Sequence, residues 1–416
     1  MGLEAVMRTF YPEQEPVNVG TTAGAQCSKS TIGLDEKGRP VSVSKEVKHR
    51  AIVGITGAGK TTLAQSLKEV DLHRKRKVVE IEPALEAKCE GIFMNLPNND
   101  PVMVKILERD FGLEPQGFKT VAYTPNTAKY RAFIEKYPEM EKFFKPVKFT
   151  EKQMMNMLLK ILPGGPVERM LLYSYMHDIE GDYDLNALVF YIRESEEIPV
   201  YMKATAAKIR YIANIGVISE DGVPIEKILK GKEASLITLA FVDDPLDRFM
   251  VSLIYLTAFY ETWKEMPHNR ILSFYVADAN LFAPARSKDH LDSLSRYQQR
   301  ARALLQVYAR ISRAQAVAWT LDFQSWHDID GVVKDQMHER FFKRNWSGEV
   351  AKMLKIEPYE LRRLGKPYAY FSNMLSIRKI KVRPPLSRKA RQGQFTPQDF
   401  VNEYRRFEDE EATHNI

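Results

Sequence analysis

Eight consecutive residues of this chain have the types and the spacing of a phosphate-binding loop. The run GITGAGKT, residues 54–61, matches the pattern GxxxxGK[ST] at every fixed position, with an apolar run before it and a helical pattern after it. The glycines let the backbone curl so that its N–H groups point at phosphate oxygens, and the helix that starts near Lys60 adds its positive end. Lys60 can bridge the β- and γ-phosphates, and Thr61 can offer its hydroxyl to Mg²⁺.

This pattern predicts a site for ATP and Mg²⁺, in which Lys60 is a catalytic residue and Thr61 a metal ligand. The alternative is a glycine-rich turn that binds nothing, but such a turn does not require the flanking strand and helix. The residues expected to bind the nucleotide are Gly54, Thr56, Gly57, Ala58, Gly59, Lys60, Thr61 and Thr62.

A P-loop site also needs an acid at the end of a neighbouring strand to hold Mg²⁺ and to orient water. The run Ile271–Val276 is apolar enough for a central strand, and Asp278 follows it at the edge where ligands bind in open parallel sheets. We expect Asp278 to be a catalytic and metal-binding acid, unless it only caps the next segment. Glu80 and Glu82, in VVEIEP, face either the nucleotide or solvent, and Glu82 is the second catalytic candidate.

Asp243 and Asp244 end another candidate strand, but Asp-Asp-Pro is also a common turn and helix start. The eight histidines show no metal-ligand spacing, and no hydrolase motif stands out.

The composition is that of an ordinary globular protein with a modest excess of positive charge. Lys and Arg number 61 against 54 for Asp and Glu, which permits a polyanionic partner without requiring one. Cys27 and Cys89 are too few for a disulfide framework or a cysteine-rich zinc site. The N-terminus lacks the apolar core of a signal peptide, and the longest apolar-rich run, Phe249–Tyr260, is too short to span a membrane. We therefore expect a soluble, cytoplasmic protein without a direct membrane span.

Alternating strand and helix patterns predict an α/β protein of the P-loop NTPase (RecA-like) class, with a mostly parallel sheet covered by helices on both faces. The expected parts are an N-terminal arm (1–30), the first part of an ATPase core with the P-loop (31–125), a helical insertion subdomain (126–232), the second part of the core (233–345), and a C-terminal β-hairpin and tail (346–416). The basic end of the hairpin is expected to continue as a flexible tail.

Four segments together resemble the HerA/FtsK superfamily of P-loop DNA-pumping ATPases, and its HerA branch most closely. They are HRAIVGITGAGKTT at the P-loop, VADANLFAP (276–284), SRAQAVAWTLDFQSWHDID (312–330) and the C-terminal KPYAYFSNMLSIRKIKVRPPLSR. The segments keep the order of the family from about residue 31 to 388. About 30 residues precede the first matching strand, too few for the N-terminal β-barrel of full-length HerA proteins, so a compact form is expected.

Carried over position by position, the resemblance implies two further catalytic residues. Gln324 matches the sensor glutamine that follows the fourth core strand, and Arg313 matches an arginine that in a ring reaches the neighbouring subunit's nucleotide as a finger; Arg310 lies close to it. The second motif departs from the family, because Ala277 stands where the metal-holding Asp belongs and Asp278 where the catalytic Glu belongs. This departure bears on the rate of hydrolysis and not on nucleotide binding.

The resemblance implies an ATP-driven double-stranded DNA translocase of packaging or helicase type, which hydrolyses ATP at the subunit interfaces of a homohexameric ring. A nuclease, a portal or a membrane-channel protein would be its partner. The basic stretches Ser287–Arg313 and 377–391 suit DNA phosphates, but a solvated helix face or a subunit contact explains them too. The alternative function is an ATP-binding scaffold or switch of a DNA-transfer or secretion apparatus with weak hydrolysis. A small-molecule kinase that shares only the P-loop is a third interpretation.

Overall fold

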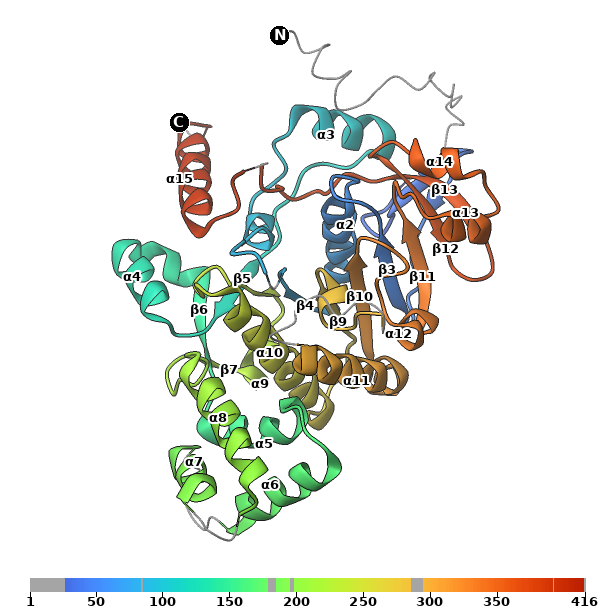
Figure 1. Ribbon diagram of the computed structural model, residues 1–416. Coiled ribbons are helices and arrows are strands. Elements are labelled where there is room, and N and C mark those ends of the chain that lie inside the picture. The colour runs from blue at the N-terminus through green and yellow to red at the C-terminus, as the bar shows by residue number, and fades with distance from the viewer. Residues whose placement is uncertain are drawn as a thin grey trace.

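The computed structural model describes residues 27–83, 85–178, 185–194, 198–285, 295–391 and 393–414, which form an α/β structure around one large sheet (Figure 1). The sheet has 13 strands in the order β2-β1-β13-β12-β11-β3-β10-β9-β4-β8-β5-β6-β7. Neighbouring strands are parallel from β11 to β7 and antiparallel from β2 to β11. The predicted fold class is confirmed.

The five strands at the centre of the sheet position the phosphate-binding loop. In spatial order they are β11 (Met337–Phe342), β3 (His49–Val53), β10 (Val317–Phe323), β9 (Leu272–Val276) and β4 (Lys77–Ile81). Because they run in the same direction, their carboxyl ends meet at one edge, where ligands bind in such sheets. The loop after β3 therefore lies between the ends of β11 and β10.

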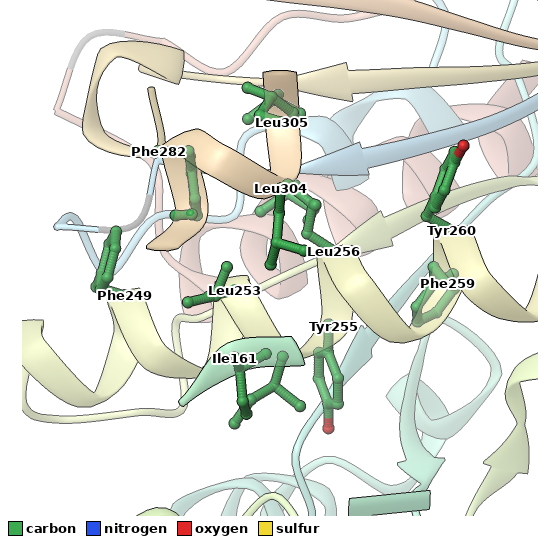
Figure 2. Packing of buried hydrophobic residues seen from close by; sticks show 14 of the residues in the cluster. Ile161, Phe249, Leu253, Tyr255, Leu256, Phe259, Tyr260, Phe282, Leu304 and Leu305 are labelled. Atoms are coloured by element: carbon green, nitrogen blue, oxygen red, sulfur yellow. The ribbon is translucent and has the colours of Figure 1, made fainter. Parts of the chain in front are cut away.

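Helices cover both faces of these strands. On one face α2 (Lys60–His73) packs against a cluster that includes Ile52 and Tyr275. On the other face α10 (Pro245–Glu265) and α11 (Ser295–Ile311) form a larger cluster, part of which Figure 2 shows around α10. Side chains alternate along β3, so Ile52 points to the α2 face, whereas Ala51 and Val53 point to the face covered by α10 and α11. Residues 286–294 of the predicted basic segment lie outside the described residues.

Antiparallel hairpins extend the sheet beyond β11, and one of them is the C-terminal hairpin that the sequence predicts. They are β12 (Tyr368–Ser372) with β13 (Ile377–Val382), and β1 (Gly33–Asp35) with β2 (Pro40–Val41). On the opposite side the sheet continues through β8 (Ala234–Ile237) and β5 (Thr120–Thr124). The remaining short elements include η1 (Gly91–Asn95), α3 (Pro101–Ile106), η4 (Ala279–Leu281), η6 (Ser312–Gln315), α12 (Gly331–Asp335), α13 (Gly348–Leu354) and α14 (Pro358–Arg362).

The stretch 126–232, read from sequence as helices, also contributes two strands to the sheet. Its helices are α4 (Ala128–Lys136), α5 (Glu151–Ile161), α6 (Pro166–Asp178), α7 (Leu185–Glu194), α8 (Val200–Asn214) and α9 (Ile225–Lys230). The strands are β6 (Phe144–Lys148) and β7 (Val223–Pro224). The sequence FKPVK of β6 holds a proline and two lysines, so local propensity does not predict the strand, and pairing with β5 decides it. Within the described ranges, none of the helices combines the length and the apolar character that crossing a membrane requires.

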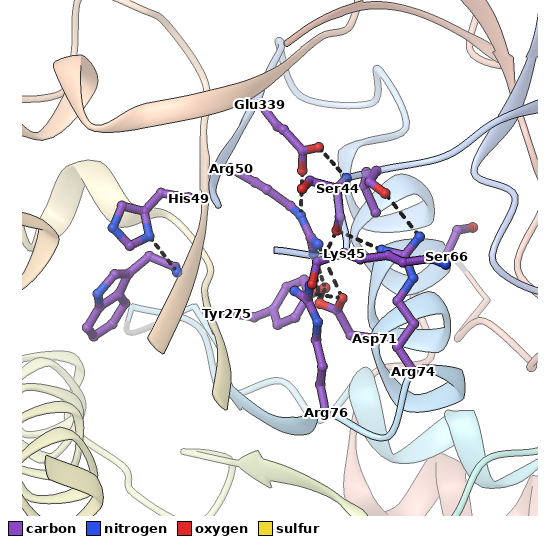
Figure 3. Close-up of polar contacts among 12 residues, drawn as sticks. Ser44, Lys45, His49, Arg50, Ser66, Asp71, Arg74, Arg76, Tyr275 and Glu339 are labelled. Carbon is purple, nitrogen blue, oxygen red and sulfur yellow. Dashed lines mark hydrogen bonds and ion pairs between the residues drawn. The ribbon is translucent and has the colours of Figure 1, made fainter. Parts of the chain in front are cut away.

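A buried network of charges fixes β3 against its neighbours (Figure 3). Arg50, on β3, donates to Asp71 of α2 over 2.7 Å and to Glu339 of β11 over 3.1 Å. The Tyr275 hydroxyl of β9 donates to the same Asp71 over 2.8 Å. Arg50 and Asp71 are fully buried, and Glu339 nearly so. The network therefore ties β3, which leads into the phosphate-binding loop, to β11, β9 and α2.

The chain after β13 lies along α2, and we call residues 383–391 the strap. Glu69 of α2 accepts hydrogen bonds from the guanidinium of Arg383, from the backbone N–H of Leu386 and from the backbone and side chain of Ser387. Arg388 pairs with Glu403 of α15 (Pro397–His414) over 3.0 Å. The predicted flexible basic tail is therefore wrong for this segment, because Arg383 and Arg388 are buried in ion pairs.

Lys343, the residue after β11, lies under the phosphate-binding loop. A Cβ placed on Gly54 would come within 2.7 Å of the Lys343 Cβ, and a Cβ on Gly59 would lie 3.6 Å from its Nζ. The Nζ donates to the backbone carbonyl of Lys366. Burial lowers the pKa of Lys343 to about 7, because a desolvated ammonium group is costly.

We expect Glu69→Ala to lower the free energy of unfolding by about 3–5 kcal/mol, because it leaves the buried Arg383 without a counter-charge. Urea denaturation followed by circular dichroism measures the change. Glu139→Ala, which removes an exposed ion pair with Arg405, is the control and should leave the midpoint where it is. Equal effects of the two substitutions would contradict a structural role for the strap.

We expect Lys343→Met to stabilise the protein most at pH 7 and below, by about 2–4 kcal/mol. The pKa of Lys343 is about 7 in the folded chain, against an ordinary value of 10.5. Between pH 7 and pH 10.5 the unfolded chain therefore binds more protons than the folded chain, so the stability of the unchanged protein rises with pH. The benefit of the substitution should therefore shrink from pH 7 towards pH 10. Lys352→Met, at an exposed position of α13, is the control, and a benefit of Lys343→Met that does not change with pH would contradict the argument.

Candidate functional site

The loop at residues 54–59 has the backbone conformation that a phosphate cradle needs. Gly57 and Gly59 have φ angles of 75° and 89°, in the left-handed region that favours glycine. The N–H of Ile55 donates to the carbonyl of Arg344 over 3.0 Å, and the N–H of Gly54 donates to the carbonyl of Phe323 over 3.3 Å. The ends of β11 and β10 thus hold the loop from both sides.

Helix α2 begins at Lys60 directly after the loop and presents the groups predicted to bind a nucleotide. Thr56, Gly57 and Thr61 are exposed, whereas Ala58 is buried. Thr62 accepts a hydrogen bond from the Nζ of Lys389 in the strap over 3.3 Å. The curled loop, the helix start and the exposed hydroxyl of Thr61 fit a bound phosphate with its metal ion.

Asp322, on β10, is the acid in contact with Lys60, and the sequence analysis did not single it out. Its Oδ1 lies 3.8 Å from the Lys60 Nζ. Burial, together with the carboxylates of Asp278 and Glu80, raises the pKa of Asp322 to about 7, although Lys60 opposes the shift. An acid inside the apolar run AVAWTLDF, two residues before Gln324, was the signal that could have identified it.

Asp278 lies at the carboxyl end of β9, at the same edge of the sheet. Its φ is 47°, a conformation that costs about 1–3 kcal/mol in a residue other than glycine and is common at functional sites. Its side chain makes no capping hydrogen bond to η4, so the capping alternative gains no support. Burial and Glu86 raise the pKa of Asp278, while Lys60 and Lys88 lower it. The charge of Lys60 is thus shared between Asp278 and Asp322.

The other predicted acids have different surroundings. Glu82 is buried at the end of β4 and accepts from the N–H of Gly91 over 3.3 Å, and burial with the neighbouring Glu80 raises its pKa well above the ordinary value. Asp243 pairs with Lys129 at the surface. Asp244 accepts from two backbone N–H groups at the start of α10, which agrees with the helix-start interpretation.

Gln324 and Arg313 lie at opposite ends of β10. Gln324 is exposed after the carboxyl end, and its carbonyl accepts from the side chain of Asn345. Arg313 lies in η6, before the amino end, and its Nη1 is 3.2 Å from the Nε2 of His338. The seven residues of β10 separate the two ends by roughly 20 Å. Gln324 is therefore beside the loop of its own chain, and Arg313 is remote from it.

Among the described residues, no group of three His, Cys, Asp or Glu side chains is placed to hold a metal ion by itself. A magnesium ion at this edge would depend on phosphate oxygens, the Thr61 hydroxyl and water together with one carboxylate. Asp278, whose carboxylate lies at the end of β9 and whose pKa is raised mainly by burial, fits the role of that one carboxylate.

Comparison with known proteins gives matches in structure only. No protein-family model matches the sequence, and no curated protein matches it. The bacterial conjugative coupling protein TrwBΔN70 in an unbound form is 12% identical with a TM-score of 0.53, over 88% of this chain and 94% of that one. VirB4 of Thermoanaerobacter pseudethanolicus is 12% identical with a TM-score of 0.52, over 87% of this chain and 97% of that one.

The plasmid coupling protein TrwB in complex with ADP and Mg²⁺ is 13% identical with a TM-score of 0.50, over 95% of both chains. At such low identity the likeness establishes a common fold. The chain therefore shares the fold of TrwB and VirB4, and the P-loop NTPase fold class predicted from the sequence is confirmed.

Proposed function

We propose that this chain binds ATP with Mg²⁺ and serves as a slowly hydrolysing switch or scaffold ATPase in a DNA-transfer or secretion apparatus. The observation that carries the proposal is the position of Lys60, at the start of α2 and facing acids at the ends of two neighbouring strands. The likeness in fold to TrwB, solved with ADP and Mg²⁺, supports both the ligand and the setting.

The residues around the loop divide the work of binding. The backbone N–H groups of Thr56, Gly57 and Gly59 would face the β-phosphate of bound ATP, and Lys60 would reach from the β- to the γ-phosphate. Thr61 and Asp278 would hold Mg²⁺, which neutralises charge on the phosphates when it is bound. Gln324, exposed beside the loop, would report through its side-chain amide whether the γ-phosphate is present.

The acids of the site predict slow turnover. Ala277 removes a carboxylate from the end of β9, and Asp278 has a shorter side chain than the glutamate that its position resembles. Asp278 is also held in a left-handed conformation, which fixes the direction in which its Cα–Cβ bond leaves the end of β9. We expect turnover of roughly 1 s⁻¹ or less, at or below the low end of ordinary enzymes.

We expect Lys60→Ala to weaken the binding of a fluorescent ATP analogue by about 10- to 100-fold, because it removes hydrogen bonds from a charged donor. Titration with and without EDTA measures the affinity and its dependence on Mg²⁺, and phosphate release measures turnover. Lys227→Ala, on the exposed side of α9, is the matched control. Nucleotide binding that survives Lys60→Ala unchanged would overturn the proposal.

A ring-shaped translocase on double-stranded DNA is the second candidate, and the position of Arg313 favours it. Arg313 is exposed and far from the loop of its own chain, so it can meet a nucleotide only in another copy. It lines a groove together with Glu46, Val47, Arg310, Ile311, Ala314 and Gln336. In this candidate the chain is a homohexamer, double-stranded DNA speeds hydrolysis, and a nuclease, portal or membrane-channel protein is the partner.

For the translocase we expect Arg313→Ala to lower DNA-stimulated hydrolysis by about 10³-fold while nucleotide affinity is kept. Arg310→Ala, three residues away on the same surface, is the matched control and should keep most of the activity. Mixing Arg313→Ala chains with inactive Lys60→Ala chains should restore some hydrolysis, since one kind of interface then has both residues. A mixture that stays inactive, or a hydrolysis rate that DNA does not change, would contradict the ring-shaped translocase. The switch or scaffold ATPase would then be the function that remains.

A further inference from the structure

The acid in direct contact with Lys60 belongs to β10, whereas the motif that should supply acids ends β9. Position 277 at the end of β9 is alanine, so that strand offers Asp278 alone. The Asp322 carboxylate approaches the Lys60 Nζ to 3.8 Å, and the side chain of Asp322 keeps 17% of its surface exposed. It is thus partly buried yet reachable by water.

The register of the sheet explains why Asp322 points at the phosphate-binding loop. Its partner across the parallel pair is Ile52, two residues before the loop begins, while Leu321 is paired with Val276 of β9. Ile52 belongs to the cluster that packs on α2, and Leu321 and Phe323 belong to the cluster on the opposite face. Asp322 therefore stands on the α2 face of the sheet, in front of the loop and between β3 and β9.

A purely structural ion pair with Lys60 does not explain the position of the Asp322 carboxylate. Among the described residues, the 3.8 Å approach to Lys60 is the one polar contact recorded for the Asp322 side chain, and that distance is too long for a hydrogen bond. Glu80, the nearby acid on β4, is by contrast held by Lys68 at 2.6 Å. Asp322 is left with free acceptor capacity at the point where Lys60 meets the phosphates.

We propose, on the basis of the proposed ATPase function, that Asp322 is the carboxylate that orients and deprotonates the attacking water. The water oxygen forms a bond to the γ-phosphorus while the bond from that phosphorus to the β–γ bridging oxygen breaks. The electron pair of the broken bond stays on the β-phosphate of ADP, and the water proton passes to the Asp322 carboxylate and then to solvent. Asp322 thereby supplies the water-activating carboxylate from β10, while Asp278, the acid that remains at the end of β9, is left to hold Mg²⁺.

The test compares Asp322→Asn with Asp278→Asn, and with Asp243→Asn as the control at an exposed acid. Asp322→Asn is expected to lower the single-turnover rate of phosphate release at least about 100-fold, the usual scale of a lost general base. The dissociation constant for the ATP analogue should change by less than about threefold. Asp322→Ala should regain part of its rate in sodium formate and not in sodium chloride of equal ionic strength, which a structural role does not predict.

Three results overturn the assignment. Hydrolysis by Asp322→Asn within threefold of the unchanged chain shows that Asp278 acts alone. A fall in rate matched by an equal loss of nucleotide affinity shows that Asp322 only shapes the binding site. If the unchanged chain binds ATP through Lys60 but releases no phosphate, Asp322 has no catalytic role and the chain is a nucleotide switch. If ATP binding does not depend on Lys60, the proposed function itself is wrong.

Discussion

The buried charge of Arg50 is the constraint on which the position of the phosphate-binding loop depends. A guanidinium without access to water needs anionic partners, and Arg50 finds them in Asp71 of α2 and Glu339 of β11. Burial alone would raise the pKa of Asp71, but Arg50 and Arg76 hold it below its ordinary value. Such a pair adds little net stability compared with apolar side chains, yet breaking it is costly. Its effect is geometric, because the loop begins directly after β3, and β3 cannot shift without unpairing a buried charge.

The strap is also held in place by buried ion pairs and hydrogen bonds to α2. Glu69 and Gln65 lie on successive turns of α2 and form hydrogen bonds with backbone and side-chain groups of residues 383–388. The strap then reaches the first turn of the helix, where Lys389 contacts Thr62, a residue predicted to bind the nucleotide. Basic residues that suggested DNA contact are therefore divided between burial, as for Arg383, and exposure, as for Arg378 on β13.

Local pattern was enough to predict the loop, the alternating core and the C-terminal hairpin, because each depends on residues close together in sequence. It was not enough for β6, whose FKPVK becomes a strand only through pairing with β5. It also failed for the strap, since a run of basic residues reads as solvated unless the distant Glu69 is known. Asp322 was missed for the same reason: within its own strand it is one acid among apolar residues, and only the packing of β10 beside β3 brings it to Lys60.

Residues proposed to take part in the chemistry lie at both ends of strand β10. Asp322 and Gln324 stand at the carboxyl end beside the loop, and Arg313 precedes the amino end. The strand is paired with β3 on one side and β9 on the other, and most of its side chains are buried. Close packing of this kind resists bending, so a displacement at one end is transmitted as a shift of the whole strand. In an assembly where Arg313 meets a second chain, β10 therefore connects Asp322, the proposed base of one site, to the segment that presents Arg313 to the next site.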